Sequence, residues 1–397
     1  MRILLLSDCY APTVNGVVSS VTTLQRGLEA QGNEVRVLAT GNERATTFDG
    51  RVYRIASLGA GALYPMARVG KPLDRRLLRH VLDWGPDVIH SHTEFVTFMW
   101  ARRIAEALGV PQVHTYHTVY EDYTHYFSPN RSVGRAVAAK LTRRVLSGTD
   151  LVVAPTAKVE HLLRGYRLPT PIRVIPTGVD LERFTSAARP PGDRAQGRAA
   201  LRARLGIVAD VPVVLYVGRL AHEKNLAETL RLLAGSRHLD WRFVAVGDGP
   251  DAAHHRRLAA DLGIAERVVF TGGVHPDDVS DYYRLGDVFV SSSSSETQGL
   301  TYIEALASGL PVLCRADPVL DGVVSDGVNG YQYREPEHFA AHLAALLGDC
   351  DLRRRLGDQA RAGSLRFSQE AFAAAVLDSY VSAGAVRDRH LWGRQAA

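Results

Sequence analysis

Two cations follow a short β-branched segment in the middle of the chain. Arg219 and Lys224 come directly after residues 213–217, within the run Gly-Arg-Leu-Ala-His-Glu-Lys. Arginine offers a rigid fork of donors and lysine a compact charge, so the two together suit a diphosphate. Cations usually face solvent, and an ordinary solvated loop is the alternative interpretation.

A second cluster of polar residues follows the apolar segment 288–291. It consists of Glu296, Gln298, Gly299, Leu300, Thr301 and Glu304. A helical pattern begins after Gly299, and the free amides and dipole of a helix start attract anions. Glycine there lets a ligand approach the backbone closely. Because carboxylates beside a phosphate are unfavourable unless they accept hydrogen bonds, Glu296 and Glu304 favour a ligand rich in hydroxyls, such as a sugar nucleotide. A capped helix with a solvated Glu304 is the simpler alternative.

Short β-branched runs alternate with helical patterns along the chain, which is typical of βαβ units and parallel sheets. Strands are expected at residues 3–6, 34–38, 52–55, 88–90, 112–115, 151–154, 173–175, 213–217, 242–246, 268–271, 288–291 and 312–314. We predict an α/β fold of two doubly wound Rossmann-like domains, 1–185 and 186–370, with a helix in 371–397 that returns to the first domain. Residues 186–198 are expected to be a surface connection. Ligands of such sheets bind beyond the carboxyl ends of strands, where both clusters stand.

The bulk composition fits a soluble globular enzyme of two domains. The chain has 397 residues, of which 46% are hydrophobic and 22% charged, with a net charge of +5. Its three cysteines are scattered, and no apolar run approaches the roughly 20 residues of a membrane span. We expect a cytoplasmic protein whose membrane contact, if any, is peripheral, on the inner face of the cell membrane. The basic residues match no nucleic-acid-binding motif, so nucleic acid is not an expected partner.

The spacing of Glu296 and Glu304, Glu-x7-Glu, resembles the signature of family 4 glycosyltransferases, which are retaining enzymes with the GT-B fold. Gly-Arg at 218–219 with Lys224, Pro-Thr-Gly-Val-Asp at 176–180 and the loops at 246–250 and 270–272 resemble further motifs of that family. A narrower similarity is carried by 90–95, 114–123 and 296–300, which resemble bacterial diacylglycerol glycosyltransferases that use a UDP-sugar.

The resemblance implies a role for each matching residue, in a cleft between the two domains. Arg219 and Lys224 would hold the donor diphosphate with the backbone of Leu300 and Thr301. Glu304 would accept from the ribose. Glu296 would accept from the transferred sugar, with Gln298 and Gly299 nearby.

From the N-terminal domain, the resemblance places His117 against the reacting sugar and Gly16 near the donor phosphates or the acceptor. Many relatives carry two glycines at the second position, whereas this chain has one. The resemblance further implies UDP-glucose or UDP-galactose as donor, a membrane lipid such as diacylglycerol as acceptor, retention of anomeric configuration, and no required cofactor or metal.

Four histidines, His90, His92, His114 and His117, cluster around two expected strand ends. Zinc is one interpretation. Buried sheet histidines or sugar contacts are the other, which the lack of acidic or cysteine partners favours. The Asp-Cys-Asp run at 349–351 lacks a strand end before it, so we predict no metal site.

Residues 131–145 form a basic helical pattern in which Val133, Val137, Leu141 and Val145 recur every four positions. Such a helix could rest on an anionic membrane surface. The alternative is a surface helix that packs its apolar stripe inward. Similarly, the aromatic segment 116–127 predicts either an acceptor pocket or core packing.

Other functions stay open from the sequence. The same fold could use GDP-mannose or a UDP-sugar on another lipid-linked or glycan acceptor, such as a polyprenyl-linked glycan or phosphatidylinositol. A non-catalytic nucleotide-sugar-binding protein is an alternative of another class. A Rossmann dehydrogenase is disfavoured, because no Gly-x-Gly-x-x-Gly follows the first strand.

Overall fold

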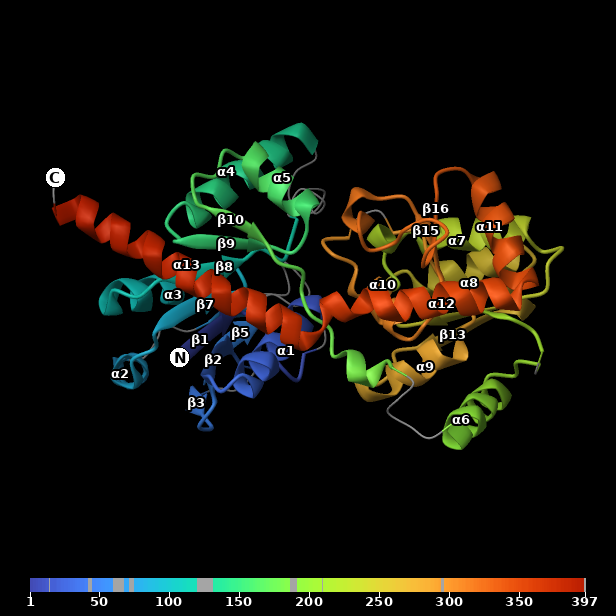
Figure 1. Cartoon of the computed structure of the whole chain (residues 1–397), viewed down its shortest axis with the longest axis horizontal. Helices are drawn as coiled ribbons and strands as arrows, with labels where there is room; N and C mark the ends of the chain where they lie inside the picture. Colours follow the sequence, from blue (N-terminus) through green and yellow to red (C-terminus); the bar gives the residue numbers. More distant parts are fainter. Residues whose placement is uncertain are drawn as a thin grey trace. The chain divides into compact units, whose positions relative to one another are not determined.

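The computed structural model describes residues 1–13, 15–41, 45–59, 68–70, 75–119, 131–185, 191–208, 210–293 and 296–395. The chain forms two compact units (Figure 1). Unit 1 comprises Met1–Gly178 and Gln369–Ala397, and unit 2 comprises Val179–Ser368. The aromatic residues at 120–127 lie outside the described residues, as do 186–190 of the expected connection.

Unit 1 is built on an eight-stranded sheet with the order β10-β9-β8-β7-β1-β2-β4-β3. Neighbouring strands run parallel, except that β3 pairs with β4 in the antiparallel direction. The strands are β1 (Arg2–Ser7), β2 (Glu34–Thr40), β3 (Thr47–Phe48), β4 (Val52–Ile55), β7 (Val88–Ser91), β8 (Gln112–Thr115), β9 (Leu151–Ala154) and β10 (Ile172–Val174). A separate antiparallel pair consists of β5 (Ser57–Gly59) and β6 (Arg68–Gly70).

Helices cover both faces of this sheet, so its central strands are apolar on both sides. In β1, Ile3 and Leu5 face one core, whereas Leu4 and Leu6 face another. The helices of unit 1 are α1 (Gly16–Ala30), α2 (Arg75–Trp84), α3 (Val96–Leu108), α4 (Arg131–Leu146), α5 (Ala157–Gly165) and α13 (Gln369–Gln395). Helices α1 and α13 cover the first face, and α2 to α5 cover the second.

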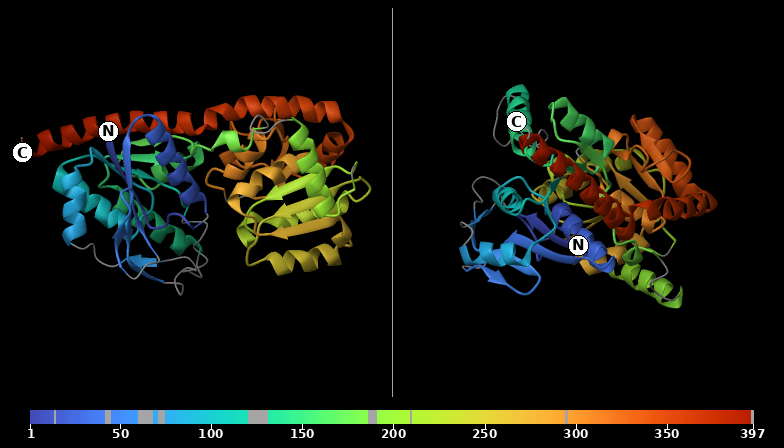
Figure 2. Two further views of the ribbon diagram at one scale, coloured as in Figure 1. Left: turned by 90° about the horizontal axis from the view of Figure 1, so that it is seen from below. Right: turned by 60° about the vertical axis from the view of Figure 1, so that its left-hand side comes forward.

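The C-terminal helix α13 lies beside α1 (Figure 2). Its Phe372, Val376 and Tyr380 join the core that β1 and α1 form. The two helices approach closely at Gly27, where an added Cβ would lie 2.8 Å from the Cβ of Ala373. The last segment of the chain therefore completes the core of the first unit.

Unit 2 contains a six-stranded parallel sheet with the order β13-β12-β11-β14-β15-β16. The strands are β11 (Val213–Val217), β12 (Arg242–Val246), β13 (Val268–Gly272), β14 (Val288–Ser291), β15 (Val312–Arg315) and β16 (Gly330–Tyr333). The chain moves outward from β11 to β13 and then returns to add β14 on the other side of β11. The switch point of this doubly wound sheet therefore lies between β11 and β14.

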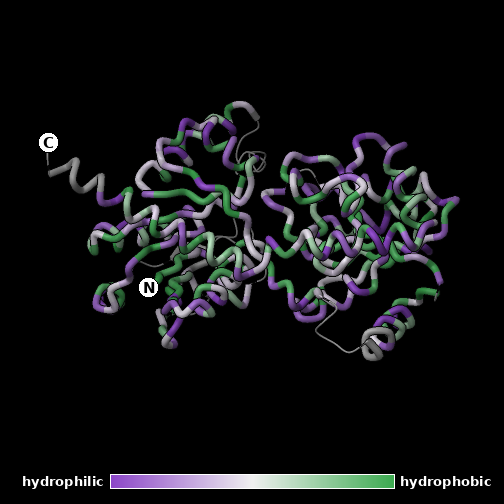
Figure 3. Tube along the Cα trace, in the orientation of Figure 1, coloured by the Kyte–Doolittle hydropathy of each residue, from purple (hydrophilic) through white to green (hydrophobic). Residues whose placement is uncertain are grey.

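The α-helices of unit 2 are α6 (Pro191–Arg204), α7 (Leu226–Gly235), α8 (Ala252–Asp261), α9 (Val279–Leu285), α10 (Leu300–Ala307), α11 (Pro336–Gly348) and α12 (Cys350–Ser364). Short 3-10 turns are η2 (Leu181–Arg183), η4 (His222–Lys224), η5 (Ala265–Arg267), η6 (Pro276–Asp278), η7 (Pro318–Leu320) and η8 (Leu365–Phe367). Helices α9 and α10 pack against one face of the sheet, and α7, α8 and α11 against the other. In each unit, hydrophobic segments run through the middle (Figure 3).

The strands expected from the apolar runs are present, with ends that differ by at most two residues. The expectation of a connection through residues 186–198 is wrong in its second part, because α6 begins at Pro191. Proline is favoured at a helix start, and the alanines and arginines that follow form helices readily. Strand β16 was not expected, because Gly-Tyr-Gln-Tyr contains no β-branched residue. None of the helices in the described residues combines the length and apolar character needed to cross a bilayer.

Candidate functional site

The sheet order of unit 2 brings two of the predicted residues into contact. Strands β11 and β14 are neighbours, with Val214 beside Val288. Their carboxyl ends therefore meet at the same edge, where the following loops carry Lys224 and Glu296. The Lys224 Nζ lies 2.7 Å from Glu296 Oε1, and the two side chains are 25% and 13% exposed. A cation and a carboxylate 72 residues apart in sequence thus form a mostly buried ion pair.

The loop after β11 is fixed by the loop after β12. The Gly218 amide donates to Val246 O at 3.0 Å, and the Leu220 amide donates to Asp248 O at 3.0 Å. At Gly247, where φ is +134°, an added Cβ would lie 2.0 Å from Gly218 O. The two loops therefore pack backbone to backbone, which requires glycine at this position.

Arg219 lies on the loop after β11. The buried Tyr216 hydroxyl donates to Arg219 O at 3.1 Å, and the guanidinium Nη1 lies 4.0 Å from Glu223 Oε1. Burial raises the pKa of Tyr216 far above its ordinary range, and the charges of Glu296 and Glu223 raise it further. The phenol therefore stays a proton donor, and the carboxylates of both loops lie within electrostatic range of one tyrosine.

Helix α10 begins directly after the expected glycine. Gly299 adopts a left-handed conformation, with φ of +76°, and an added Cβ would lie 2.7 Å from Tyr302 Cδ2. Gly299 has no side chain that could cap the helix, and among the described residues no side-chain cap bond is made to its first turn, which begins with Leu300 and Thr301. Gln298 is buried beside this turn. Free amides at the start of a helix attract anions.

Glu304, in the second turn of α10, is held by Tyr283 of α9. The Tyr283 hydroxyl donates to Glu304 Oε2 at 2.6 Å. Burial raises the pKa of Glu304 to about 7, against the opposing effects of the Tyr283 hydrogen bond and the Arg183 charge. The carboxyl group therefore exists in both protonation states near neutral pH.

A polar network behind these loops was not anticipated from the sequence. Ser292, directly after β14, lies 2.7 Å from the hydroxyls of Thr229 and Tyr333. Tyr333 also donates to Glu228, which accepts from Arg315 Nη1 at 2.6 Å. These residues come from α7, β15 and β16, and no local sequence pattern relates them. They fix the residue that begins the polar loop after β14.

In unit 1, the two strand histidines are buried and hydrogen-bonded, as predicted. His90 bonds to Tyr380 OH through Nδ1 and to Thr115 Oγ1 through Nε2, each at 2.8 Å. His114 lies 2.9 Å from Ser91 Oγ and 3.2 Å from Glu94 Oε1. Both ring nitrogens of each imidazole therefore have protein partners.

His92 and His117 form a pair after β7 and β8, with His92 Nδ1 3.1 Å from His117 Nε2. Burial, with nearby histidines, lowers the pKa of His92 well below its ordinary value and that of His117 to about 3. Both rings are thus neutral at physiological pH. No group of three or more histidine, cysteine or acidic residues in the described part of the chain is arranged to hold a metal ion. Asp349 instead caps α12, accepting from the Leu352 amide at 2.8 Å.

Gly16 is the first residue of α1, which Asn15 caps by accepting from the Val18 amide at 2.9 Å. An added Cβ at Gly16 would meet no described protein atom within 4 Å, so packing does not require glycine there. Gly16 and His117 belong to unit 1, whereas the other predicted site residues belong to unit 2.

Another polar residue at the carboxyl ends of the unit 1 strands was not predicted from the sequence. Asp8, directly after β1, accepts from the Thr93 hydroxyl at 2.6 Å and from the Thr97 amide at 3.0 Å. It thereby joins the end of β1 to the first turn of α3. The sequence signal that could have identified Asp8 is an acidic residue immediately after a buried strand.

Two doubly wound sheets with polar residues at the carboxyl ends of their strands define the GT-B class of fold. A sucrose-phosphate synthase from Thermosynechococcus elongatus has this fold, with a TM-score of 0.72, 23% identity and coverage of 99% of both chains. The model of Glycosyltransferase Family 4 matches residues 14–183, and that of Glycosyl transferases group 1 matches residues 197–363.

Two curated relatives are alpha-monoglucosyldiacylglycerol synthases. The protein from Streptococcus pneumoniae is 35% identical over 356 residues, which cover 89% of this chain and 80% of the relative. That from Acholeplasma laidlawii is 31% identical over 387 residues, covering 94% and 95%. The chain therefore belongs to the group 1, family 4 glycosyltransferases and is a hexosyltransferase. The predicted fold and family are confirmed, and the dehydrogenase alternative is wrong.

Proposed function

We propose that this enzyme transfers a hexose from UDP-glucose or UDP-galactose to diacylglycerol, with retention of anomeric configuration and without a required metal. The observation that carries the proposal is the Lys224–Glu296 pair, 2.7 Å apart, in the two loops at the switch point of the unit 2 sheet. The names of the two bacterial relatives support diacylglycerol as the acceptor.

The donor diphosphate would bind Lys224 in place of Glu296. This cation neutralises Glu296 in the structure. A diphosphate carries more charge than one carboxylate and would compete with Glu296 for Lys224. Arg219 and the amides of Leu300 and Thr301 would complete the phosphate site. Because UDP leaves with growing negative charge, donors fixed in advance at this position would stabilise the transition state.

The hydroxyl groups of the donor would occupy the carboxylates. Glu296, released from Lys224, would accept from the hydroxyls of the transferred sugar, next to Gln298 and Gly299. Glu304 would accept from the ribose. The raised pKa of Glu304, about 7, supports a role in which a ligand restores the hydrogen bonds that water supplies to an exposed carboxylate.

We assign the neutral His117 to the transferred sugar and Gly16 to the donor phosphates or the acceptor. A neutral imidazole can both donate and accept a hydrogen bond, which suits a sugar hydroxyl. The open space around Gly16 within its own unit is consistent with a ligand contact there.

The surface of α4 supports a membrane-bound acceptor. Val133, Val137 and Leu141, which we name the apolar stripe, are 54%, 44% and 57% exposed. The helix packs inward through a different set of residues, Gly134, Ala138, Thr142 and Leu146. The alternative in which the stripe packs into the core is therefore wrong for these three residues.

Exposed cations flank the apolar stripe, and α4 carries no acidic residue. They are Arg135, Lys140, Arg143 and Arg144. Apolar side chains flanked by cations are the features that bind a helix to an anionic bilayer surface. We therefore propose that α4 rests on the inner face of the cell membrane.

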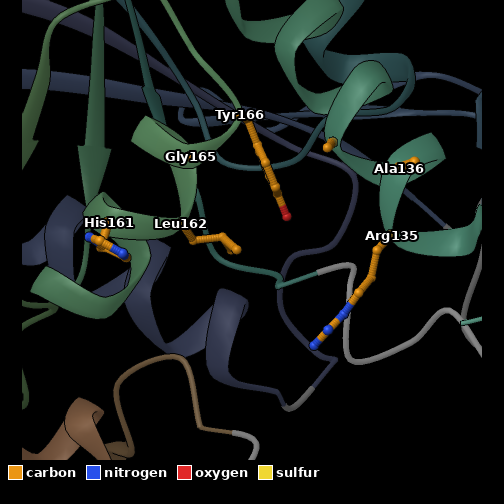
Figure 4. A pocket seen from close by; sticks show the side chains of 7 residues that line it. Arg135, Ala136, His161, Leu162, Gly165 and Tyr166 are labelled. Atoms are coloured by element: carbon orange, nitrogen blue, oxygen red, sulfur yellow. The ribbon is translucent and has the colours of Figure 1, made fainter. Parts of the chain in front are cut away.

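An open groove of about 420 Å³ lies between α4 and α5 (Figure 4). Arg135 and Tyr166 extend toward it from the two sides. Ala139 and Leu162 contribute apolar lining, and His161 also lines the groove. An apolar groove with a cation at one end suits the region of a lipid between its headgroup and its chains.

The experiment that tests the proposal is a transfer assay with vesicles that contain diacylglycerol. UDP-glucose, UDP-galactose and GDP-mannose are compared as donors, and phosphatidylinositol and a polyprenyl-linked glycan as alternative acceptors. NMR of the product gives the anomeric configuration. Glucosyl- or galactosyl-diacylglycerol with the α-configuration of the donor is the expected product. Transfer from GDP-mannose alone, transfer to another acceptor alone, or inversion would each contradict the corresponding part of the proposal.

A further inference from the structure

Tyr283 is a buried residue of α9 that no sequence motif singles out. Its hydroxyl donates to Glu304 Oε2 at 2.6 Å and lies 3.3 Å from Thr301 O. Its ring packs edge-on against Phe184, with centroids 5.4 Å apart, and stacks with Phe289 at 6.1 Å. The aromatic neighbours therefore fix the direction of the hydroxyl, and the hydroxyl contacts both turns of α10.

This contact determines how Glu304 can meet a ligand. Because Tyr283 holds Oε2, rotation of the carboxylate is restricted. Within the described residues, Oε1 makes no hydrogen bond to the protein. The arrangement thus presents one oriented carboxylate oxygen at the second turn of the helix whose start would bind the diphosphate.

We propose that Tyr283 is a positioning residue that aims Glu304 at the ribose of the donor and so makes the enzyme select ribonucleotides over 2′-deoxyribonucleotides. This inference rests on the nucleotide-sugar site of the proposed function. An enzyme rejects a nucleotide that lacks a hydroxyl strongly only where the carboxylate oxygen that would accept from that hydroxyl is fixed. A mobile carboxylate can accept from water or from another hydroxyl instead.

The charges around Glu304 give this contact a second, measurable consequence. Two groups from neighbouring elements favour its charged form, the Tyr283 hydroxyl of α9 and the Arg183 guanidinium of η2. Arg183 is itself held by its bond to Pro276 O at 2.7 Å. Removing the Tyr283 hydroxyl therefore raises the pKa of Glu304 above its present value of about 7.

The test compares Tyr283→Phe with Tyr282→Phe in the full-length enzyme. Tyr282 is the adjacent buried tyrosine, and its hydroxyl accepts from Arg204 instead of contacting Glu304. Calorimetry measures the affinity for UDP and 2′-deoxy-UDP, and in parallel for GDP and 2′-deoxy-GDP, across pH. We expect the wild type to prefer the ribonucleotide by about tenfold, the value of one hydrogen bond to a charged group.

Tyr283→Phe should reduce that preference at least threefold and move the pH midpoint of binding upward, whereas Tyr282→Phe should change neither. In the Glu304→Gln background, Tyr283→Phe should have no further effect on the preference. A loss that persists in that background would show a merely structural role and overturn the inference.

The outcomes separate the two proposals. If UDP binds with a ribose preference that Tyr283→Phe leaves unchanged, only the role of Tyr283 is overturned. If GDP binds and UDP does not, the uridine donor is overturned while the role of Tyr283 is still measured with GDP. If neither diphosphate binds, the nucleotide site and this inference fall together.

Discussion

The Nζ of Lys224 lies 2.7 Å from Oε1 of Glu296, so the cation of one loop and the carboxylate of the next neutralise each other across the switch point of the unit 2 sheet. Both side chains are mostly buried. An anion that binds Lys224 must therefore displace Glu296, and a group that binds Glu296 must displace Lys224. A ligand that carries phosphate at one end and hydroxyls at the other satisfies both residues at once. Under the proposed function, the two residues of this pair would bind two parts of the same donor.

Removing either half of this pair should reduce transfer. We expect Lys224→Ala or Glu296→Ala to lower kcat/KM at least tenfold, about 1.4 kcal/mol of transition-state stabilisation, because each leaves a charged partner uncompensated as well as losing a donor contact. Steady-state kinetics with a varied donor measures the effect, and circular dichroism checks that the fold persists. Arg354→Ala, which removes the exposed pair with Asp351 on α12, is the control and should keep normal rates. Near-normal rates in both Lys224→Ala and Glu296→Ala would refute the assignment.

Gly299→Ala should impair donor binding through the backbone. The left-handed conformation costs a residue with a Cβ about 1–2 kcal/mol, and here the added Cβ would also lie 2.7 Å from Tyr302 Cδ2. We expect a lower thermal midpoint and a higher KM for the donor. Gly363→Ala in α12, where an added Cβ meets no described atom beyond its own helix backbone within 4 Å, should instead be neutral or stabilising. Equal midpoints for the two variants would contradict this account of Gly299.

Donor affinity should depend on the protonation of Glu304. Burial raises its pKa to about 7, so the carboxylate form increases as pH rises through 7. Since only the carboxylate accepts two hydroxyl hydrogen bonds without donating a proton, UDP affinity should increase between about pH 6 and pH 8. Glu304→Gln should bind more weakly, with a flat profile over that range. A pH-dependent rise that survives in Glu304→Gln would assign it to another group.

The same shift has a consequence for stability. The folded protein holds a proton on Glu304 at pH values where the unfolded chain, with an ordinary pKa near 4.5, has lost it. The contribution of this group to the free energy of unfolding is therefore fully present below about pH 4.5 and is lost as pH rises through 7. Thermal midpoints of wild type relative to Glu304→Gln should fall across this window. A difference that stays constant would contradict the raised pKa.

His117 should remain neutral throughout the active pH range. Burial and the charge of His114 lower its pKa to about 3, and its Nε2 contacts His92 Nδ1. Nitrogen-detected NMR of labelled imidazoles should show no titration of His117 above about pH 4. Titration of His117 near neutrality would show that the ring is reached by solvent and would remove the basis for a neutral sugar contact.

Membrane binding should depend on the apolar stripe. Leu141→Glu places a charge where a 57% exposed leucine would enter the bilayer, so binding to vesicles with anionic lipid should fall severalfold. Val381→Glu is the matched control, because Val381 is 69% exposed on α13, away from the basic helix. Co-sedimentation with anionic and with neutral vesicles measures both variants. Equal losses in the two variants, or binding that ignores lipid charge, would argue against α4 as the contact.

The amino-acid sequence alone pointed to most of the residues of the proposed donor site. The apolar runs 213–217 and 288–291 are each followed by polar residues of this site. Strands of buried parallel sheets are continuous in sequence, and their ends are marked by a change to polar residues. The spacing of Glu296 and Glu304 and the glycine before α10 are likewise local, because a helix start is encoded within a few residues. These local signals were sufficient for the fold class, the family and the residues proposed for the diphosphate.

Tertiary structure alone decided which of these residues touch. Periodicity shows which side chains share a face of a helix, but not which face finds a partner, so the apolar stripe of α4 lies outside while Ala138 lies inside. Tyr283 contacts Glu304, and Lys224 contacts Glu296, because the order of the strands brings together residues that are far apart in the sequence. That order results from the packing of all the strands and helices together, and no short segment of the sequence contains it.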